Sequence, residues 1–123
     1  MRYPPRVPAR LIDRLAIGWF LVVTWLSLTP LPELPDLQTS DKVGHVAAYA
    51  ALAALATLSR RSYGAILAMV AAIVAYGGLV ELIQPLVNRH GELGDFLANC
   101  AGAIAGTGIA LSLSWFGARW KAR

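Results

Sequence analysis

The chain has 123 residues, of which 57% are hydrophobic and only 15% are charged, and its net charge is +4. An average soluble domain carries roughly 25% charged residues, so this chain has too few charges to cover the surface of one. The positive balance does not indicate a nucleic-acid partner, because the basic residues gather at the ends of apolar segments. We therefore expect an integral membrane protein with membrane lipids as its surroundings.

Four stretches contain no Asp, Glu, Lys or Arg: residues 15–31, 43–59, 62–80 and 96–118. Each is long enough for a helix to cross hydrocarbon, which takes about 17 to 25 residues. Backbone groups in lipid must be hydrogen-bonded within their own segment, so these stretches are predicted to be helices. The expected fold is all-α, with a single membrane domain over residues 1–123. Its four transmembrane helices, at about 11–31, 41–59, 62–84 and 95–117, would form a compact bundle.

The first predicted helix ends in a proline-rich stretch that begins at Pro30 and favours an extended exit. Its basic start and apolar body resemble a signal peptide, but the apolar run is long and no Ala-x-Ala follows it. We therefore expect the helix to be retained. Residues 32–40 are predicted to form a first outer loop.

Small residues dominate the second and fourth predicted helices. The second is rich in alanine, and the fourth contains Gly102-x-x-x-Gly106. Helices in lipid associate through close van der Waals contact, which small residues permit. We expect this motif to pack within one bundle. In the third predicted helix, Pro85 cannot donate to the carbonyl of Glu81, so the helix should kink or end there.

The charged residues divide between two sides of the predicted membrane domain. Nine of the eleven basic residues fall on one side: Arg2, Arg6, Arg10, Arg14, Arg60, Arg61, Arg119, Lys121 and Arg123. Basic residues beside transmembrane helices mark the cytoplasmic face, so both termini are predicted to be cytoplasmic.

The other side carries polar residues at three helix ends and in a loop. Residues three or four apart share a face of a helix, which aligns these side chains in stripes that can converge. We expect them to form an outward-facing polar pocket that binds a ligand. The candidate residues are Asp41, Lys42, His45, Tyr49, Glu81, Gln84, Arg89, Asp95 and Asn99.

Several of these residues also have simpler interpretations. Asp41 and Asp95 can cap helix N-termini, Lys42 can extend to lipid head groups, and Asn99 can bond to a neighbouring helix. Glu81 is the hardest to explain in this way, because it follows a long uncharged run. It should be paired with a cation or protonated. His90 and Glu92 in the second outer loop are expected to be solvated.

The polar positions form a pattern. It consists of Asp41-Lys42-x-x-His45 with Tyr49, Glu81-x-x-Gln84, Arg89, Asp95-x-x-x-Asn99 and Gly102, preceded by Ser27-Leu28-Thr29-Pro30. The pattern resembles the VanZ-like family from about Ile17 to Ile109. The resemblance implies a bacterial multi-pass protein of the inner membrane, and the family's namesake is associated with low-level resistance to the glycopeptide teicoplanin. Glu92 departs from the pattern, because a small hydroxyl residue is expected there.

Three functions fit these residues. The first is a binding protein for an envelope lipid head group, a lipid-linked glycan or a glycopeptide, with Lys42, His45 and Arg89 as donors. The second is an intramembrane enzyme in which His45 and Glu81 act as general acid and base and Asp95 orients one of them. The third is a structural or assembly partner whose polar residues lock the helices together. Asp41, His45, Glu81 and Asp95 could ligate a metal, but neither a resident metal nor a cofactor is expected.

Overall fold

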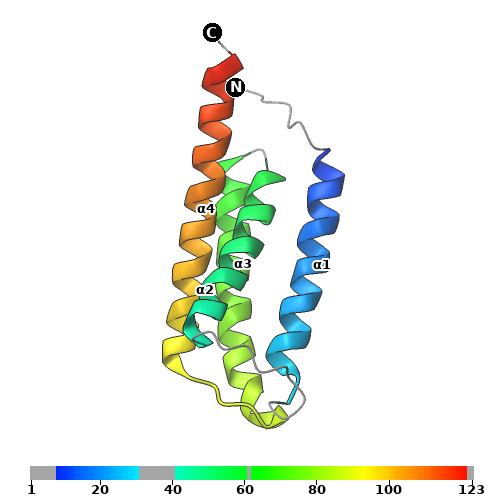
Figure 1. Ribbon diagram of the computed structural model, residues 1–123, viewed down its shortest axis with the longest axis vertical. Helices are drawn as coiled ribbons and strands as arrows, with labels where there is room; N and C mark the ends of the chain where they lie inside the picture. Colours follow the sequence, from blue (N-terminus) through cyan, green and yellow to red (C-terminus); the bar gives the residue numbers. More distant parts are fainter. Residues whose placement is uncertain (1–7, 31–40, 61, 122–123) are drawn as a thin grey trace.

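The computed structural model of the protein describes residues 8–30, 41–60 and 62–121, and their regular structure is entirely helical. The helices are α1 (Ala9–Leu28), α2 (Asp41–Leu58), α3 (Tyr63–Ile83), the short 3-10 helix η2 (Gln84–Val87) and α4 (Leu93–Lys121). The α-helices lie side by side along the long axis of the molecule (Figure 1). The all-α class is therefore confirmed. The predicted outer loop at 32–40 lies outside the described residues.

Three of the helices are long and apolar enough to cross a membrane: α1, α3 together with η2, and α4. The apolar part of α2 covers Lys42–Leu58 and is shorter. At about 1.5 Å per residue, the 18 residues of α2 span about 27 Å. Large apolar side chains on α1, α3 and α4 face outward, including those of Ile17, Leu67, Leu82, Ile104 and Leu113. Such a surface is consistent with a membrane protein.

Local sequence explains where the helices begin and end. Thr29 follows α1 in an extended conformation (φ −77°, ψ 133°), so the helix stops before Pro30 rather than just after it. The reason is that proline disfavours the helical conformation of the residue that precedes it. Ser62 caps α3, because its hydroxyl accepts a hydrogen bond from the backbone N–H of Ala65 at 3.2 Å. Near Pro85, α3 gives way to η2, so the predicted break is confirmed.

The start of α4 differs from the expectation for Asp95. The helix begins at Leu93, and the backbone N–H of Asp95 already bonds to the carbonyl of Glu92 at 3.1 Å. Asp95 therefore lies in the first turn and is not the N-cap. Its carboxylate still lies close to the partial positive charge of the helix N-terminus. The side chain of Asp41, the other predicted cap, lies outside the described part of the structure.

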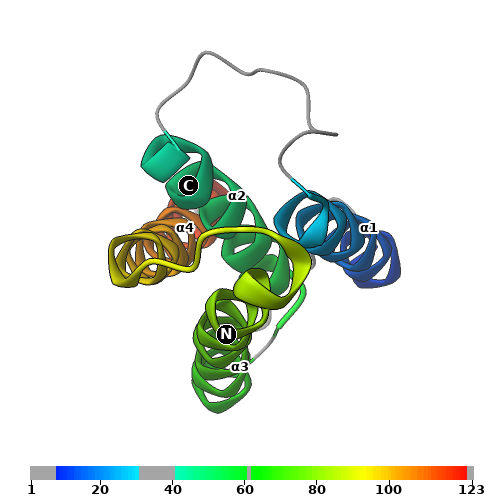
Figure 2. The ribbon, with the colours of Figure 1, turned by 90° about the horizontal axis from the view of Figure 1, so that it is seen from below.

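Helix α2 is the central element of the fold, because it contacts α1, α3 and α4 and packs against α4 more extensively than any other pair of helices. Viewed along the helices, it lies between α1 and α4 (Figure 2). Gly102 and Gly106 of α4 lie directly against the backbone of Val46 and Ala50 in α2, where a Cβ atom would overlap main-chain atoms. The prediction that Gly102-x-x-x-Gly106 packs within the molecule is therefore confirmed.

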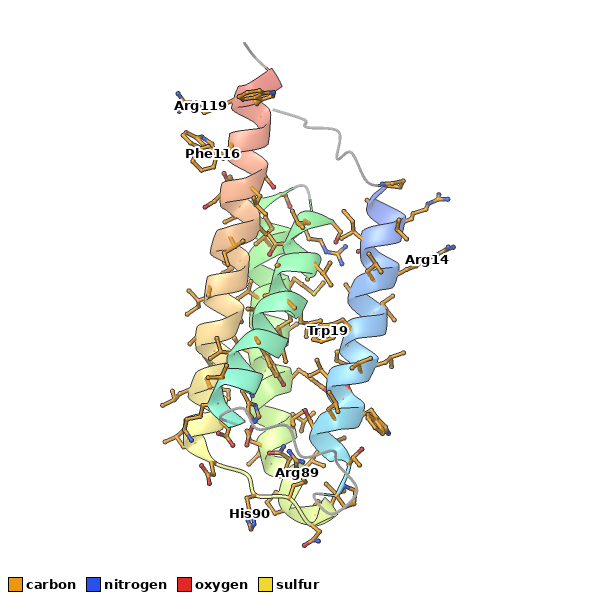
Figure 3. The ribbon with its side chains drawn as sticks, in the orientation of Figure 1. Arg14, Trp19, Arg89, His90, Phe116 and Arg119 are labelled. Atoms are coloured by element: carbon orange, nitrogen blue, oxygen red, sulfur yellow. The ribbon has the colours of Figure 1, made fainter. Side chains whose placement is uncertain are left out.

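The two ends of the molecule differ in their charged residues. Arg14 and Arg119 lie at one end, and Arg89 and His90 lie at the other (Figure 3). Trp19 links α1 to the central helix, because its indole N–H donates to the backbone carbonyl of Ala48 at 2.9 Å. The helix packing thus brings the starts of α2 and α4 and the end of α3 together at the end that contains Arg89.

Candidate functional site

Asp95 is the buried carboxylate at the centre of a polar cluster. Its side chain is only 4% exposed and lies between two groups from α2. The Nζ atom of Lys42 is 3.5 Å from Oδ1, and the Nε2 atom of His45 is 3.7 Å from Oδ2. Lys42 is itself 57% exposed and also lies 3.6 Å from the carboxylate of Glu92. Lys42 therefore connects the buried part of the cluster with its surface.

Asn99 joins the histidine to the carboxylate of α3. Its amide Nδ2 donates to Oε1 of Glu81 at 3.5 Å, which directs the amide oxygen towards His45. The Nδ1 atom of His45 lies 2.8 Å from that oxygen. An amide that accepts one hydrogen bond and donates another holds both of its neighbours in fixed orientations. Both ring nitrogens of His45 therefore face oxygen atoms of the protein.

Glu81 is anchored to the loop before α4. Its carboxylate Oε2 accepts a hydrogen bond from the backbone N–H of Glu92 at 3.1 Å. Its carbonyl lies against Gly91, where a Cβ atom would overlap it. The nearest ring nitrogen of His45 is within 4.8 Å of the carboxylate. Glu92 is exposed, as expected, and its side chain is 59% exposed. It nevertheless belongs to the site, because its backbone N–H bonds to Glu81 and its carboxylate lies 3.6 Å from Nζ of Lys42.

The six residues Lys42, His45, Glu81, Glu92, Asp95 and Asn99 form what we call the polar cluster. Sequence reasoning identified all of them except Glu92 as site residues. It also missed three glycines that make room for the cluster. Gly77 lies against Tyr49 and Asn99, Gly91 against Glu81, and Gly94 against Lys42. Gly77 could have been predicted from the sequence, because it lies four positions before Glu81 and therefore on the same face of α3.

Three other candidate residues lie near the cluster without a described hydrogen bond into it. Tyr49 is 1% exposed, and Gly77 leaves space for its ring. Gln84 is also 1% exposed, and its Nε2 donates to the backbone carbonyl of Ser27 at 3.1 Å. Gln84 therefore ties the end of α3 to the end of α1. The backbone N–H of Arg89 bonds to the carbonyl of Gln84 at 3.0 Å, which places Arg89 just beyond η2.

These three residues each contain a buried polar atom without a hydrogen-bond partner in the described part of the chain. The atoms are the Tyr49 hydroxyl, Oε1 of Gln84 and Nη1 of Arg89. Roughly 90% or more of buried polar groups in folded proteins have a partner. Leaving one unpaired costs about 1–3 kcal/mol. Three more such atoms, on Asp13, Arg60 and Thr107, lie away from the polar cluster in the described part of the chain. The three beside the cluster give that region capacity for further polar contacts.

His45, Glu81 and Asp95 could together hold a metal ion, since one ligand atom from each lies within 4.8 Å of the others. In the structure these atoms have protein neighbours instead: Asp95 pairs with Lys42, and Glu81 bonds to Asn99 and to the backbone of Glu92. A divalent cation would therefore have to compete with the ammonium group of Lys42.

Comparison with known proteins adds no relative: no family model, no curated protein and no solved structure matches the chain.

Proposed function

We propose that the protein is a VanZ-like membrane protein whose polar cluster, together with the adjacent Tyr49, Gln84 and Arg89, binds the polar part of an envelope molecule. The ligand is a lipid head group, a lipid-linked glycan or a glycopeptide. In this proposal all four α-helices cross the bacterial inner membrane, both termini are cytoplasmic, and the cluster faces outward. Support comes from the three membrane-length helices and from the arginines at the opposite end of the molecule.

The observation that carries the proposal is the set of buried, unpartnered atoms on Tyr49, Gln84 and Arg89. None of the six residues of the polar cluster has such an atom, as expected of residues that lock helices together, because unsatisfied groups destabilise the fold. The three neighbouring residues differ in this respect. A donor on Arg89, an acceptor on Gln84 and a hydroxyl on Tyr49 instead match a ligand with several polar groups. The resemblance of these positions to the VanZ-like pattern supports the same interpretation.

The charged residues near the cluster indicate which chemical groups the ligand carries. The site region contains the carboxylates of Glu81, Glu92 and Asp95 and the cations of Lys42 and Arg89. A bare anion would meet repulsion from the carboxylates, whereas a molecule that combines phosphate with hydroxyl or amine groups can use both signs. Arginine binds phosphate through a planar fork, and carboxylates accept hydrogen bonds from hydroxyls. Lipid-linked sugars and phospholipid head groups have this chemistry.

The enzyme alternative receives less support from the geometry of His45. A general base needs a nitrogen within hydrogen-bond reach of the substrate proton. In the structure Nδ1 faces Asn99 and Nε2 faces Asp95, so each ring nitrogen of the imidazole already has a protein neighbour. Acid–base chemistry would first require one of these contacts to open. Binding at Tyr49, Gln84 and Arg89 would also require buried atoms to become accessible, but it would leave both contacts of His45 intact.

The proposal is tested by native mass spectrometry of protein purified from membranes in mild detergent. The Arg89→Gln variant should lose the head-group species that the wild-type protein retains. Arg119→Gln, which replaces an exposed arginine at the opposite end, is the matched control and should retain them. Equal retention by both variants would overturn the binding proposal. Equal retention together with a lower melting temperature of Arg89→Gln would favour the structural alternative.

A second measurement separates binding from catalysis. Envelope lipids are profiled by mass spectrometry in deletion, wild-type and Glu81→Gln strains, and teicoplanin susceptibility is measured in parallel. A binder changes susceptibility and leaves the lipid species unchanged. New or missing lipid-linked species in both the deletion and Glu81→Gln strains would assign the site to an enzyme.

A further inference from the structure

A cavity of about 400 Å³ lies between α1, α2 and α3, away from the polar cluster. Its lining is drawn from all three helices: Asp13, Ala16, Ile17, Phe20, Leu52, Ala56, Arg60, Met69, Ala72, Ile73 and Tyr76. Cavities that hold small ligands are typically about 300–1,000 Å³. Ile17 is 60% exposed although it lines the cavity, and Ala72 is exposed as well, so the cavity is an open groove. We call it the α1–α3 groove.

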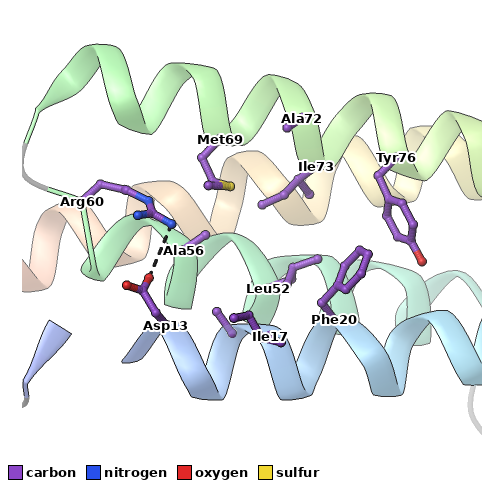
Figure 4. Close-up of a pocket in the computed structure, with 11 residues that line it drawn as sticks. Asp13, Ile17, Phe20, Leu52, Ala56, Arg60, Met69, Ala72, Ile73 and Tyr76 are labelled. Carbon is purple, nitrogen blue, oxygen red and sulfur yellow. Dashed lines mark ion pairs between the residues drawn. The ribbon is translucent and has the colours of Figure 1, made fainter. Parts of the chain in front are cut away.

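The walls of the groove are apolar and its two ends are polar (Figure 4). At one end, the Tyr76 hydroxyl is hydrogen-bonded to Thr24, which in turn donates to the carbonyl of Phe20. This hydroxyl is therefore already partnered. At the other end, Arg60 pairs with Asp13, with 3.4 Å between Nη2 and Oδ1. A long apolar surface that leads to a charged group has the form of a lipid chain attached to its head group.

The charged end has an excess of positive charge. Asp13 neutralises one cation, but Arg10 and Arg14 in α1 and Arg60 just after α2 are all close to this end. Asp13 engages one nitrogen of Arg60, and the Nε atom of Arg60 is buried without a hydrogen-bond partner in the described part of the structure. Guanidinium groups bind phosphate through several N–H donors at once. Charge complementarity therefore favours an anionic head group.

We infer that the α1–α3 groove binds one chain of an anionic phospholipid, with its phosphate at Arg60. In a bilayer an open apolar groove fills with hydrocarbon, because protein interiors tolerate few voids larger than a water molecule. Arg60 makes the occupant specific by selecting a negatively charged lipid. The groove and the polar cluster share no residue, so this site does not depend on the function proposed for the cluster.

The test compares phosphatidylglycerol with phosphatidylcholine, added to delipidated protein in detergent and detected by native mass spectrometry. Phosphatidylglycerol should bind the wild-type protein more tightly. Arg60→Gln should weaken its binding about fivefold, the effect of losing one basic residue at a membrane surface. Asp13→Asn should strengthen it, because the variant frees Arg60 from its carboxylate. Arg119→Gln, on α4 at the same end of the molecule, should leave binding unchanged.

Adjacent alanines on α3 provide a matched pair for the apolar wall. Ala72 lines the groove and Ala71 does not, although both are exposed. Ala72→Trp should fill the groove and reduce phosphatidylglycerol binding, whereas Ala71→Trp should not. Equal binding of the two lipids, or equal behaviour of the two tryptophan variants, would overturn the inference. A dimer that Ala72→Trp abolishes would instead assign the groove to a second copy of the chain.

Discussion

The imidazole Nδ1 of His45 and the amide oxygen of Asn99 lie 2.8 Å apart and join α2 to α4 inside the polar cluster. The same amide donates to Glu81 on α3, so one side chain connects three helices. Hydrogen bonds in low-dielectric surroundings strengthen one another, and an unpaired member becomes correspondingly costly. Asn99 is therefore the residue on which the geometry of the cluster most depends.

Replacing Asn99 with leucine should lower the free energy of unfolding by about 2–3 kcal/mol, since two buried polar partners lose a hydrogen bond while the number and branching of the side-chain heavy atoms are kept. The measurement is unfolding in mixed detergent micelles, followed by far-UV circular dichroism. Ser112→Ala is the control, because Ser112 is exposed and bonds to a carbonyl of its own helix. If Asn99→Leu lowered the free energy of unfolding no more than Ser112→Ala does, the hydrogen bonds of Asn99 would contribute little to stability.

Gly106 and Gly108 give a second stability test on one helix. A Cβ at Gly106 would overlap the backbone of Ala50, whereas nothing lies within 4 Å of one at Gly108. Gly106→Ala should destabilise the protein by about 1–3 kcal/mol through overpacking. Gly108→Ala should be neutral or stabilising, because alanine favours the helix. Similar melting temperatures for the two variants would contradict the close α2–α4 contact.

The proposed orientation predicts which face of the membrane each end of the molecule reaches. In a Cys100→Ala background, a cysteine at His90 should react with a membrane-impermeant maleimide in cells whose inner membrane is intact. A cysteine at Arg14 should react only after that membrane is permeabilised. The reagent is charged and hydrocarbon excludes it, so labelling reports the exposed face. Labelling of both positions from outside would contradict the cytoplasmic placement of the start of α1.

Metal addition should have little effect. Asp95 is paired with Lys42, and Glu81 is bonded to Asn99, so a divalent ion gains few free ligands. Neither EDTA nor ZnCl₂ should shift the melting temperature of the purified protein. A bound ion at a hundred times its Kd would add about 2.7 kcal/mol, which is readily detected. A zinc-dependent increase that disappears in His45→Ala would instead establish a metal site.

Periodicity and charge placement predicted much of this molecule. Uncharged stretches located the helices, and the three- and four-residue spacing brought His45, Glu81, Asp95 and Asn99 to one end. These inferences succeeded because they depend on helix geometry, which a sequence shows directly. Pro85 likewise ended α3 as expected, because the loss of a backbone donor is a local effect.

Features that depend on contacts between elements were harder to predict. Glu92 is exposed as expected, but nothing in its neighbourhood in the sequence indicates that its backbone N–H bonds to Glu81. Asp95 was expected to cap α4, but the helix begins two residues earlier, at Leu93. Sequence patterns locate a helix start only to within one or two residues. The α1–α3 groove had no sequence signal, since its walls come from three helices. The pairing of Asp13 with Arg60 also depends on that packing.

Glu81 contacts the connection between α3 and α4 twice, through its carboxylate at Glu92 and through its carbonyl at Gly91. The number of residues between Glu81 and Asp95 therefore determines how these two side chains are placed. Lengthening this connection by one residue would displace Glu92 from Glu81 and alter the approach of Asp95 to His45. Loops usually tolerate insertions well, but this one sets a distance between functional groups. The length of the connection is thus as much a part of the site as its side chains.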